Sequence, residues 1–223
     1  MKKQLLIGVI TVALFLIFAL LFPIAAASDQ QDINSGKEDF LSKYYLNEQG
    51  IIKPRIAEII INYRAEIVIQ AIAAKDFAEV AEYVHPKKGL RFTPYTYVRE
   101  EKDVVMTKEE VHDFFKDDYK YLWGSYDGSG KQIRLTPAEY YQEFIYTADF
   151  IKAEEIGYNE VISSGNMLEN QFKVYDNPII VEYYFSGFKP KFEGMDWQSL
   201  RLVFEKYQGD WKLSGIIHNQ WTI

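Results

Sequence analysis

The C-terminal end of the chain, residues 196–223, is DWQSLRLVFEKYQGDWKLSGIIHNQWTI. Its first half alternates between apolar and polar side chains, so that Leu200, Leu202 and Phe204 share one side of a strand. After residues 207–210 (YQGD) the spacing of two resumes. Two alternating runs joined by a short turn with Gly and Asp predict an antiparallel hairpin. Because a hairpin is marginally stable alone, it needs a third strand or a helix over its apolar side.

The preceding chain supplies both of these elements. Residues 179–185 alternate in the same way and predict the third strand. A long helix is predicted from near Pro54, where a proline is tolerated at a helix start. Its apolar residues recur at helical spacing, and we expect this stripe to be buried against the sheet: positions 56, 59, 60, 63, 67, 68, 71 and 72.

Shorter elements follow the long helix. Asp76 is expected to cap a second helix that ends before Pro86. Residues 91–98 and 102–106 predict two short strands, the first interrupted by Pro94.

Two capping boxes mark the starts of further helices. Thr107 with Glu110 predicts a helix that runs to about residue 118, and Thr136 with Glu139 predicts one over residues 137–146.

Helices placed ahead of an antiparallel sheet predict an α+β domain. We expect the N-terminal helices to pack on a curved antiparallel sheet, in one domain over residues 55–223 with an inserted α/β segment at about residues 119–178. In element order over residues 55–118 and 179–223, the chain resembles the nuclear-transport-factor-2-like superfamily, the ketosteroid-isomerase-like cone. The resemblance implies a long helix lying in a strongly curved sheet whose end is open. The superfamily hosts isomerases, dehydratases and non-catalytic binding modules, so the fold does not choose the function.

The N-terminus has the pattern of an export signal. Lys2 and Lys3 precede an apolar run over residues 5–22, and residues 25–27 are all alanine. This pattern predicts a secretory signal peptide over residues 1–27, with an uncleaved anchor as the alternative. Residues 28–54 are expected to form a tether and a short helix. The domain is therefore predicted to be extracytoplasmic, either secreted or held at a bacterial-type cell envelope by residues 5–22.

Composition excludes some classes of function. The formal net charge is −7, and removal of Lys2 and Lys3 would make it −9 (−7 − 2). Such an acidic chain repels phosphate backbones, so nucleic acid is not an expected partner. The chain has no cysteine, which excludes disulfides and thiol chemistry.

The concave face of the expected cone supplies the first ligand-binding candidates, namely Tyr183, Arg201, His218 and Trp221. Trp123 and Tyr126 in the inserted segment supply a second group, because aromatic faces stack on the sugar rings of a cell wall.

A cofactor-free isomerase or lyase needs a carboxylate base in an apolar pocket and a facing proton donor. Asp196 or Asp149 is the candidate base, and Tyr183 or His218 is the facing group. No spacing fixes such a pair, so no catalytic residue is assigned.

Metal and cofactor sites are not expected. The three histidines are far apart in sequence and show no ligand spacing, and the glycines at 128 and 130 match no phosphate-binding motif. Asp127 and Gly128 instead predict a hairpin turn.

These observations favour a non-catalytic, exported binding module whose partner is a small apolar molecule or an envelope protein. The alternatives are a cell-wall carbohydrate bound by the inserted aromatics, and a cofactor-free isomerase or lyase in the cone.

The export signal gives the first testable prediction. Intact-mass measurement of the protein recovered from expressing bacterial cells is expected to show a chain that begins at Ser28. A recovered chain that retains residues 1–27 would instead establish the anchor.

Overall fold

The computed structural model describes residues 45–163 and 165–222. The chain divides into two compact units, Met1–Gly50 and Ile51–Ile223. In the first unit the described residues form a turn in which the Gly50 N–H donates to the Asn47 carbonyl (3.0 Å). The predicted signal peptide or anchor, and the tether as far as residue 44, lie outside the described residues. Among the described residues, no helix has the length and apolar character needed to cross a membrane.

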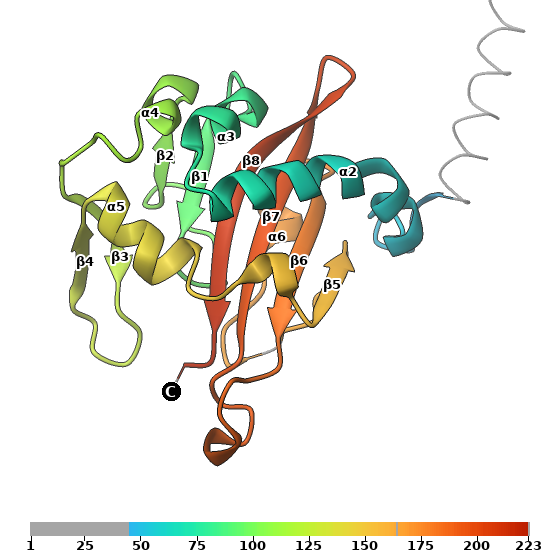
Figure 1. The fold of residues 1–223 in the computed structure, drawn as a ribbon. Helices are drawn as coiled ribbons and strands as arrows, with labels where there is room; N and C mark the ends of the chain where they lie inside the picture. The colour runs from blue at the N-terminus through green and yellow to red at the C-terminus, as the bar shows by residue number, and fades with distance from the viewer. Residues whose placement is uncertain (1–44, 164, 223) are drawn as a thin grey trace, which may run out of the picture. The chain divides into compact units, whose positions relative to one another are not determined.

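The second unit is built on a six-stranded sheet (Figure 1). Across the sheet the strands are β2 (Val104–Met106), β1 (Leu90–Thr93), β8 (Asp210–Gln220), β7 (Gln198–Tyr207), β6 (Ile179–Phe185) and β5 (Glu155–Tyr158). The predicted hairpin is confirmed as β7–β8, with Tyr207 opposite Asp210 at its turn, and the predicted third strand is confirmed as β6.

One pairing differs from the expected antiparallel sheet. β1 lies parallel to β8, with Phe92 opposite Ile216, whereas the other neighbouring strands are antiparallel. The sheet is therefore mixed. The long chain between β1 and β8 allows this arrangement, because parallel neighbours need a long crossover connection.

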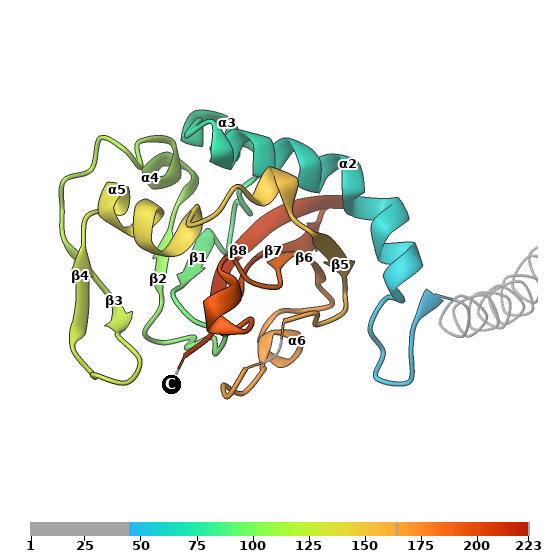
Figure 2. The same cartoon turned by 60° about the horizontal axis from the view of Figure 1, so that its bottom comes forward.

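The helices gather mainly on one face of this sheet. They are α2 (Pro54–Ala73), α3 (Phe77–Tyr83), α4 (Lys108–His112), α5 (Pro137–Tyr140), the π-helix η1 (Tyr141–Ile145), the 3₁₀ turns η2 (Phe150–Lys152) and η3 (Pro190–Phe192), and α6 (Gln171–Val174). Figure 2 shows α2, α3 and α5 on one side of the sheet and α6 on the other. The fold class is α+β, with helices packed on a curved sheet.

Local capping signals predicted the helix starts correctly. The Asp76 side chain accepts a hydrogen bond from the Glu79 N–H (3.0 Å) and caps α3. Both capping boxes are present, at Thr107 for α4 and at Thr136 for α5.

Several predicted lengths were wrong. α4 ends at His112 and continues only as turns, whereas a helix to about residue 118 was expected. The strand predicted over residues 91–98 ends at Thr93, because Pro94 has no N–H to continue the ladder.

The inserted segment contains three strands that the sequence pattern did not predict. β3 (Tyr121–Ser125) and β4 (Gln132–Leu135) form a separate two-stranded sheet, and β5 joins the edge of the main sheet. The turn between β3 and β4 holds Asp127 and Gly128, as predicted, and the Gly130 N–H donates to the Tyr126 carbonyl (2.9 Å).

The buried face of α2 differs from the predicted stripe. The residues that α2 buries are Ala57, Ile61, Ala65, Val68, Ile69, Ala71 and Ile72, whereas positions 56, 59, 60, 63 and 67 point outward or lie at the rim. The helix is apolar over most of its circumference, so the periodicity did not distinguish its two sides. Alanines at 57 and 65 let the helix backbone lie close to the sheet, which favours this side in a close-packed core.

The packing under α2 generates a prediction for stability. Leu202 is fully buried at the centre of β7, on the side that faces α2. Leu202→Ala is expected to lower the free energy of unfolding by about 2–5 kcal/mol, since it removes buried methyl groups and leaves a cavity. Urea unfolding measures the loss, and Lys206→Ala, at an exposed position of the same strand, is the control with a change of at most about 0.5 kcal/mol.

Candidate functional site

The concave face brings two of the predicted ligand-binding residues into one row. Tyr183 on β6 lies opposite Leu200 on β7, and Leu200 lies opposite His218 on β8. All three side chains are buried. The Phe144 ring of η1 lies edge-on to the His218 ring, with 5.8 Å between centroids. Side chains therefore fill the cone at His218, where an open mouth was expected.

The environment of His218 fixes its charge. Burial lowers the pKa of the imidazole to about 4, so it is neutral at physiological pH. Its Nε2 lies 3.3 Å from Oε1 of Gln220, and its Nδ1 has no hydrogen-bond partner among the residues that the structure describes. A neutral, enclosed imidazole has no contact with solvent through which it could exchange a proton with a substrate.

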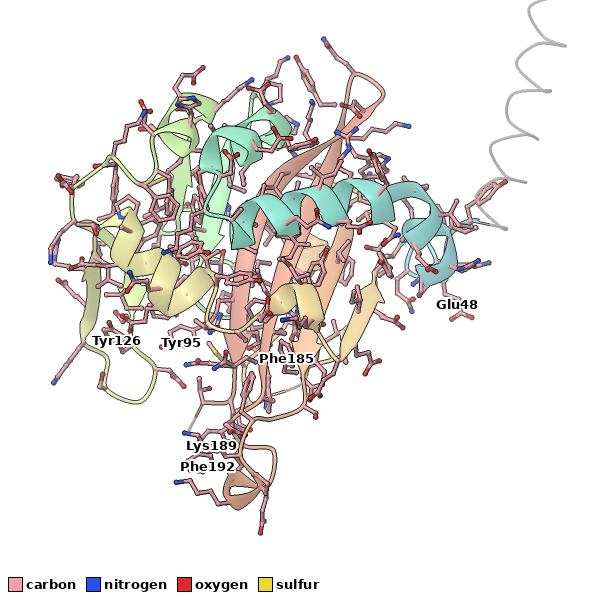
Figure 3. The ribbon with its side chains drawn as sticks, viewed as in Figure 1. Glu48, Tyr95, Tyr126, Phe185, Lys189 and Phe192 are labelled. Atoms are coloured by element: carbon pink, nitrogen blue, oxygen red, sulfur yellow. The ribbon has the colours of Figure 1, made fainter. Side chains whose placement is uncertain are left out.

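The candidate bases lie elsewhere. Asp196 lies in the loop between β6 and β7, where it accepts a hydrogen bond from the Lys189 N–H (2.9 Å); Figure 3 shows Lys189 and Phe192 on this loop, beyond the end of the sheet. Asp149 bonds to Lys152 (2.7 Å) and to the Tyr146 hydroxyl (2.7 Å). Lys152 holds the pKa of Asp149 below its ordinary value, whereas a general base at neutral pH needs a raised one.

Arg201 lies on the opposite face of the sheet from Tyr183 and His218. Because side chains alternate along a strand, Leu200 and Leu202 face α2 and the guanidinium between them points the other way. Its placement among the concave-face candidates was therefore wrong.

On the far face Arg201 is the centre of a buried polar cluster. Its Nη1 and Nη2 donate to the two carboxylate oxygens of Glu169 (2.6 and 3.1 Å), and its Nε lies 3.2 Å from Glu182 Oε1. The Ser163 hydroxyl donates to Glu182 and accepts from Arg201 and Asn219. Burial disfavours the charged guanidinium, but the carboxylates of Glu182 and Glu169 outweigh it and raise the pKa of Arg201. This cluster attaches the loop after β5 to the sheet.

The aromatic candidates of the inserted segment are mostly packed. Trp123 is fully buried, stacks on Tyr140 (3.8 Å between centroids) and donates its indole N–H to the Leu135 carbonyl (2.8 Å). It therefore offers no free face to a sugar ring. Tyr126 is half-buried near Tyr95 (Figure 3), and burial followed by a hydrogen bond to Glu143 raises the pKa of its hydroxyl to about 12.

Trp221 follows β8 at the C-terminal end and is 36% exposed. Its backbone N–H donates to the Trp197 carbonyl (3.3 Å).

A cleft of about 640 Å³ lies between the turn over residues 99–103 and the β3–β4 hairpin. We call it the hairpin cleft; its lining residues are Arg99, Lys102, Asp103, Leu122, Trp123, Gly124, Ser125 and Gln132. At Gly124 the register of β3 against β4 shifts and φ is +150°. A Cβ at this position would make an ordinary van der Waals contact with Arg99 Nη1 (3.5 Å), so the positive φ, and not a lack of space, is what favours glycine here.

Asp103 supports the wall of this cleft. Its Oδ2 accepts hydrogen bonds from the Thr93 hydroxyl (2.8 Å) and from the Arg99 N–H (2.9 Å). Burial raises the pKa of its carboxyl above the ordinary value. Sequence reasoning missed both Asp103 and Arg99, because no motif links residue 103 to residue 93; the polar run at 99–103 between two short strands was the available signal.

Among the described residues, no group of three or more His, Cys, Asp or Glu side chains converges in a way that would hold a metal ion.

Comparison with known proteins gives only distant structural likeness. No protein-family model and no curated protein matches the chain. A designed NTF2 protein is similar at 12% identity and a TM-score of 0.31, over 71% of this chain and 97% of that one. A structure titled as a putative calcium/calmodulin-dependent protein kinase II association domain from Xanthomonas campestris is similar at 10% identity and a TM-score of 0.28, over 72% of this chain and 84% of that one. At these TM-scores the fold description rests on the chain's own sheet and helices.

The environment of His218 predicts a dependence of stability on pH. Its folded pKa, about 4, lies below the unfolded value of about 6.5, so the unfolded state binds more protons between these two pH values. Well above pH 6.5, His218 should therefore leave the free energy of unfolding independent of pH. As the pH falls from 6.5 to 4, it should lower the free energy of unfolding by up to about 3 kcal/mol. Urea unfolding of the native protein and of His218→Gln at pH 7 and pH 4 measures this contribution. An equal decrease in the free energy of unfolding of both proteins between pH 7 and pH 4 would contradict it.

The Arg201 cluster predicts a structural phenotype. Arg201→Ala leaves Glu182 buried without its partner and is expected to cost about 3–5 kcal/mol in urea unfolding. Arg64→Ala removes a more exposed pair, with Asp210 (2.7 Å), and should cost about 1 kcal/mol or less. A loss at Arg201 no larger than that at Arg64 would count against the structural role.

Proposed function

We propose that the protein is a non-catalytic binding module that holds a small molecule with an anionic group in the hairpin cleft. The observation that carries the proposal is the pair of cations, Arg99 and Lys102, on the wall of a cleft of about 640 Å³. This volume is in the range of small-molecule sites, about 300–1,000 Å³. The two cations share the lining with one carboxylate, Asp103.

The lining of the cleft favours this ligand class. Asp103 is the one carboxylate in the lining, and its Oδ2 is already engaged by Thr93 and Arg99. Leu122, 42% exposed, gives the ligand an apolar contact, and Ser125 and Gln132 add neutral hydrogen-bonding groups. A charge-assisted bond from an arginine to a carboxylate or phosphate is about twice as strong as a neutral one, so Arg99 is expected to dominate affinity.

The packing around His218 favours binding without catalysis. A base and a proton donor that converge on an open pocket would favour the isomerase alternative, but Tyr183 and His218 are enclosed and Asp196 is bonded in a separate loop. The carbohydrate alternative loses its main platform, because Trp123 has no exposed face. Location at the cell envelope rests on residues 1–27, and distant membership of the nuclear-transport-factor-2-like superfamily rests on the order of the elements.

An aromatic oxyanion is a suitable probe, because the cleft combines cations with an apolar wall. Phenyl phosphate is expected to shift the indole N–H resonance of Trp123 in a ¹⁵N NMR titration, and neutral benzamide to shift it only at much higher concentration. Arg99→Gln should weaken phenyl phosphate binding by about 10-fold or more, from the loss of a charge-assisted bond of about 1.5–3 kcal/mol.

Lys131→Gln is the matched control, since Lys131 is an exposed cation on the turn of the same hairpin and does not line the cleft. Equal binding of phenyl phosphate and benzamide, or equal affinities of the Arg99 and Lys131 variants, would show that the anion is not the recognised group. No shift of the indole resonance with either probe would remove the cleft as the site.

A further inference from the structure

α2 carries a second apolar face, which the described part of the chain leaves open at its centre and covers in part at Ile56 and Ile67. We call it the outer stripe; its residues are Ile56, Ile59, Ile60, Tyr63 and Ile67. Ile59, Ile60 and Tyr63 are 67%, 43% and 77% exposed. With 100° between successive residues, the five side chains fall within one continuous sector, on the side away from the sheet.

The neighbours of α2 leave this sector open. On one flank Asn62 accepts a hydrogen bond from the Tyr158 hydroxyl of β5 (2.6 Å). On the other flank Arg64 donates to Asp210 (3.1 Å) and to the Trp211 carbonyl (2.5 Å), at the β7–β8 turn. The helix is thus held in place on both sides, with the outer stripe between the two flanks. A surface helix normally presents polar residues there, and an apolar cluster of this kind marks an interaction surface.

We propose that the outer stripe is a self-association surface on which a second copy of this chain packs its own α2 in antiparallel orientation. The charges beside the stripe select this occupant. Arg55 and Glu66 are eleven residues apart, which places them about 20° from each other, on the same edge of the stripe. In an antiparallel pair related by a two-fold axis, the same edges face each other, so Arg55 of each copy meets Glu66 of the other. The axis then crosses the helix midway between residues 55 and 66, next to Ile60 of the outer stripe.

Both charges are available for this exchange. Within the part of the chain that the structure describes, Arg55 bonds to Glu58 (2.7 Å), and Glu66 accepts a long hydrogen bond from Gln70 (3.4 Å). These are exposed contacts within the same helix, and such contacts are individually weak. A parallel two-fold pair would put the two copies of this edge on opposite sides of the interface, so neither charge would meet its partner.

The predicted pair has a geometry that can be tested directly. The stripe from residue 56 to 67 is about 17 Å long at 1.5 Å per residue, so the interface is small and the dimer is expected to dissociate readily. Two helices packed 8–10 Å apart bring residues beside the axis within the Cα separation of a disulfide, about 4.4–6.8 Å. Because the chain has no cysteine, one introduced cysteine reports on this contact alone.

Oxidative cross-linking of the full-length chain tests the proposal. Ile60→Cys is expected to give at least 10-fold more covalent dimer than Ile156→Cys, which places an equally exposed cysteine (Ile156 is 41% exposed) on β5. Adding Arg55→Glu or Glu66→Arg to Ile60→Cys should reduce cross-linking several-fold, and adding both should restore it.

Three results would overturn the proposal. Equal cross-linking of Ile60→Cys and Ile156→Cys would mean that the covalent dimer forms by random collision of two molecules. Failure of Ile60→Cys to cross-link while it reacts with a small maleimide would show an open but unpaired stripe. Failure to react with the maleimide under dissociating dilution would show that another part of the same chain covers the stripe.

Discussion

The packing of α2 on the concave face of β6, β7 and β8 is the contact on which the rest of the domain depends. Ala57, Ile61 and Ala65 bring the helix close to the sheet, opposite the row that contains Leu200 and Leu202. The sheet curves around α2, and η1 then covers the part of the concave face that α2 leaves open, with Phe144 over His218. Once both elements are in place, the interior of the cone around His218 is core.

The face of the sheet opposite α2 contains a buried charge, that of Arg201. Alternation along β7 forces Arg201 to the side opposite Leu200, where a charge is costly to bury. Glu182 on β6 and Glu169 in the loop between β5 and α6 compensate it, and Ser163 accepts a hydrogen bond from Nη2 of Arg201. The ion pair belongs to the observed register of β6 against β7, in which Glu182 lies opposite Arg201. The same register places Tyr183 beside Leu200 on the concave face.

The sequence alone predicted the strands, helices and helix caps that depend on residues close together in the chain. The β7–β8 hairpin, β6, α2 and the caps at Asp76, Thr107 and Thr136 follow from signals a few residues long, and each is present. Contacts between distant segments were not predicted. The parallel pairing of β1 with β8 joins residues more than 120 positions apart, and the bond between Thr93 and Asp103 belongs to no motif. Arg201 was placed on the concave face although the alternation of its own strand assigns it to the other side, so this error lay in the interpretation and not in the sequence.

The error on α2 has a different origin and a functional consequence. A helix that packs on one partner carries one apolar stripe, and periodicity then identifies the buried side. Here Ile56, Ile60 and Tyr63 repeat the pattern on the opposite side from Ile61 and Val68, so periodicity alone fits either side. The sheet occupies only the side with the alanines. A pattern that is ambiguous for fold prediction is therefore informative about assembly, because apolar residues that the domain's own core does not require indicate a second contact.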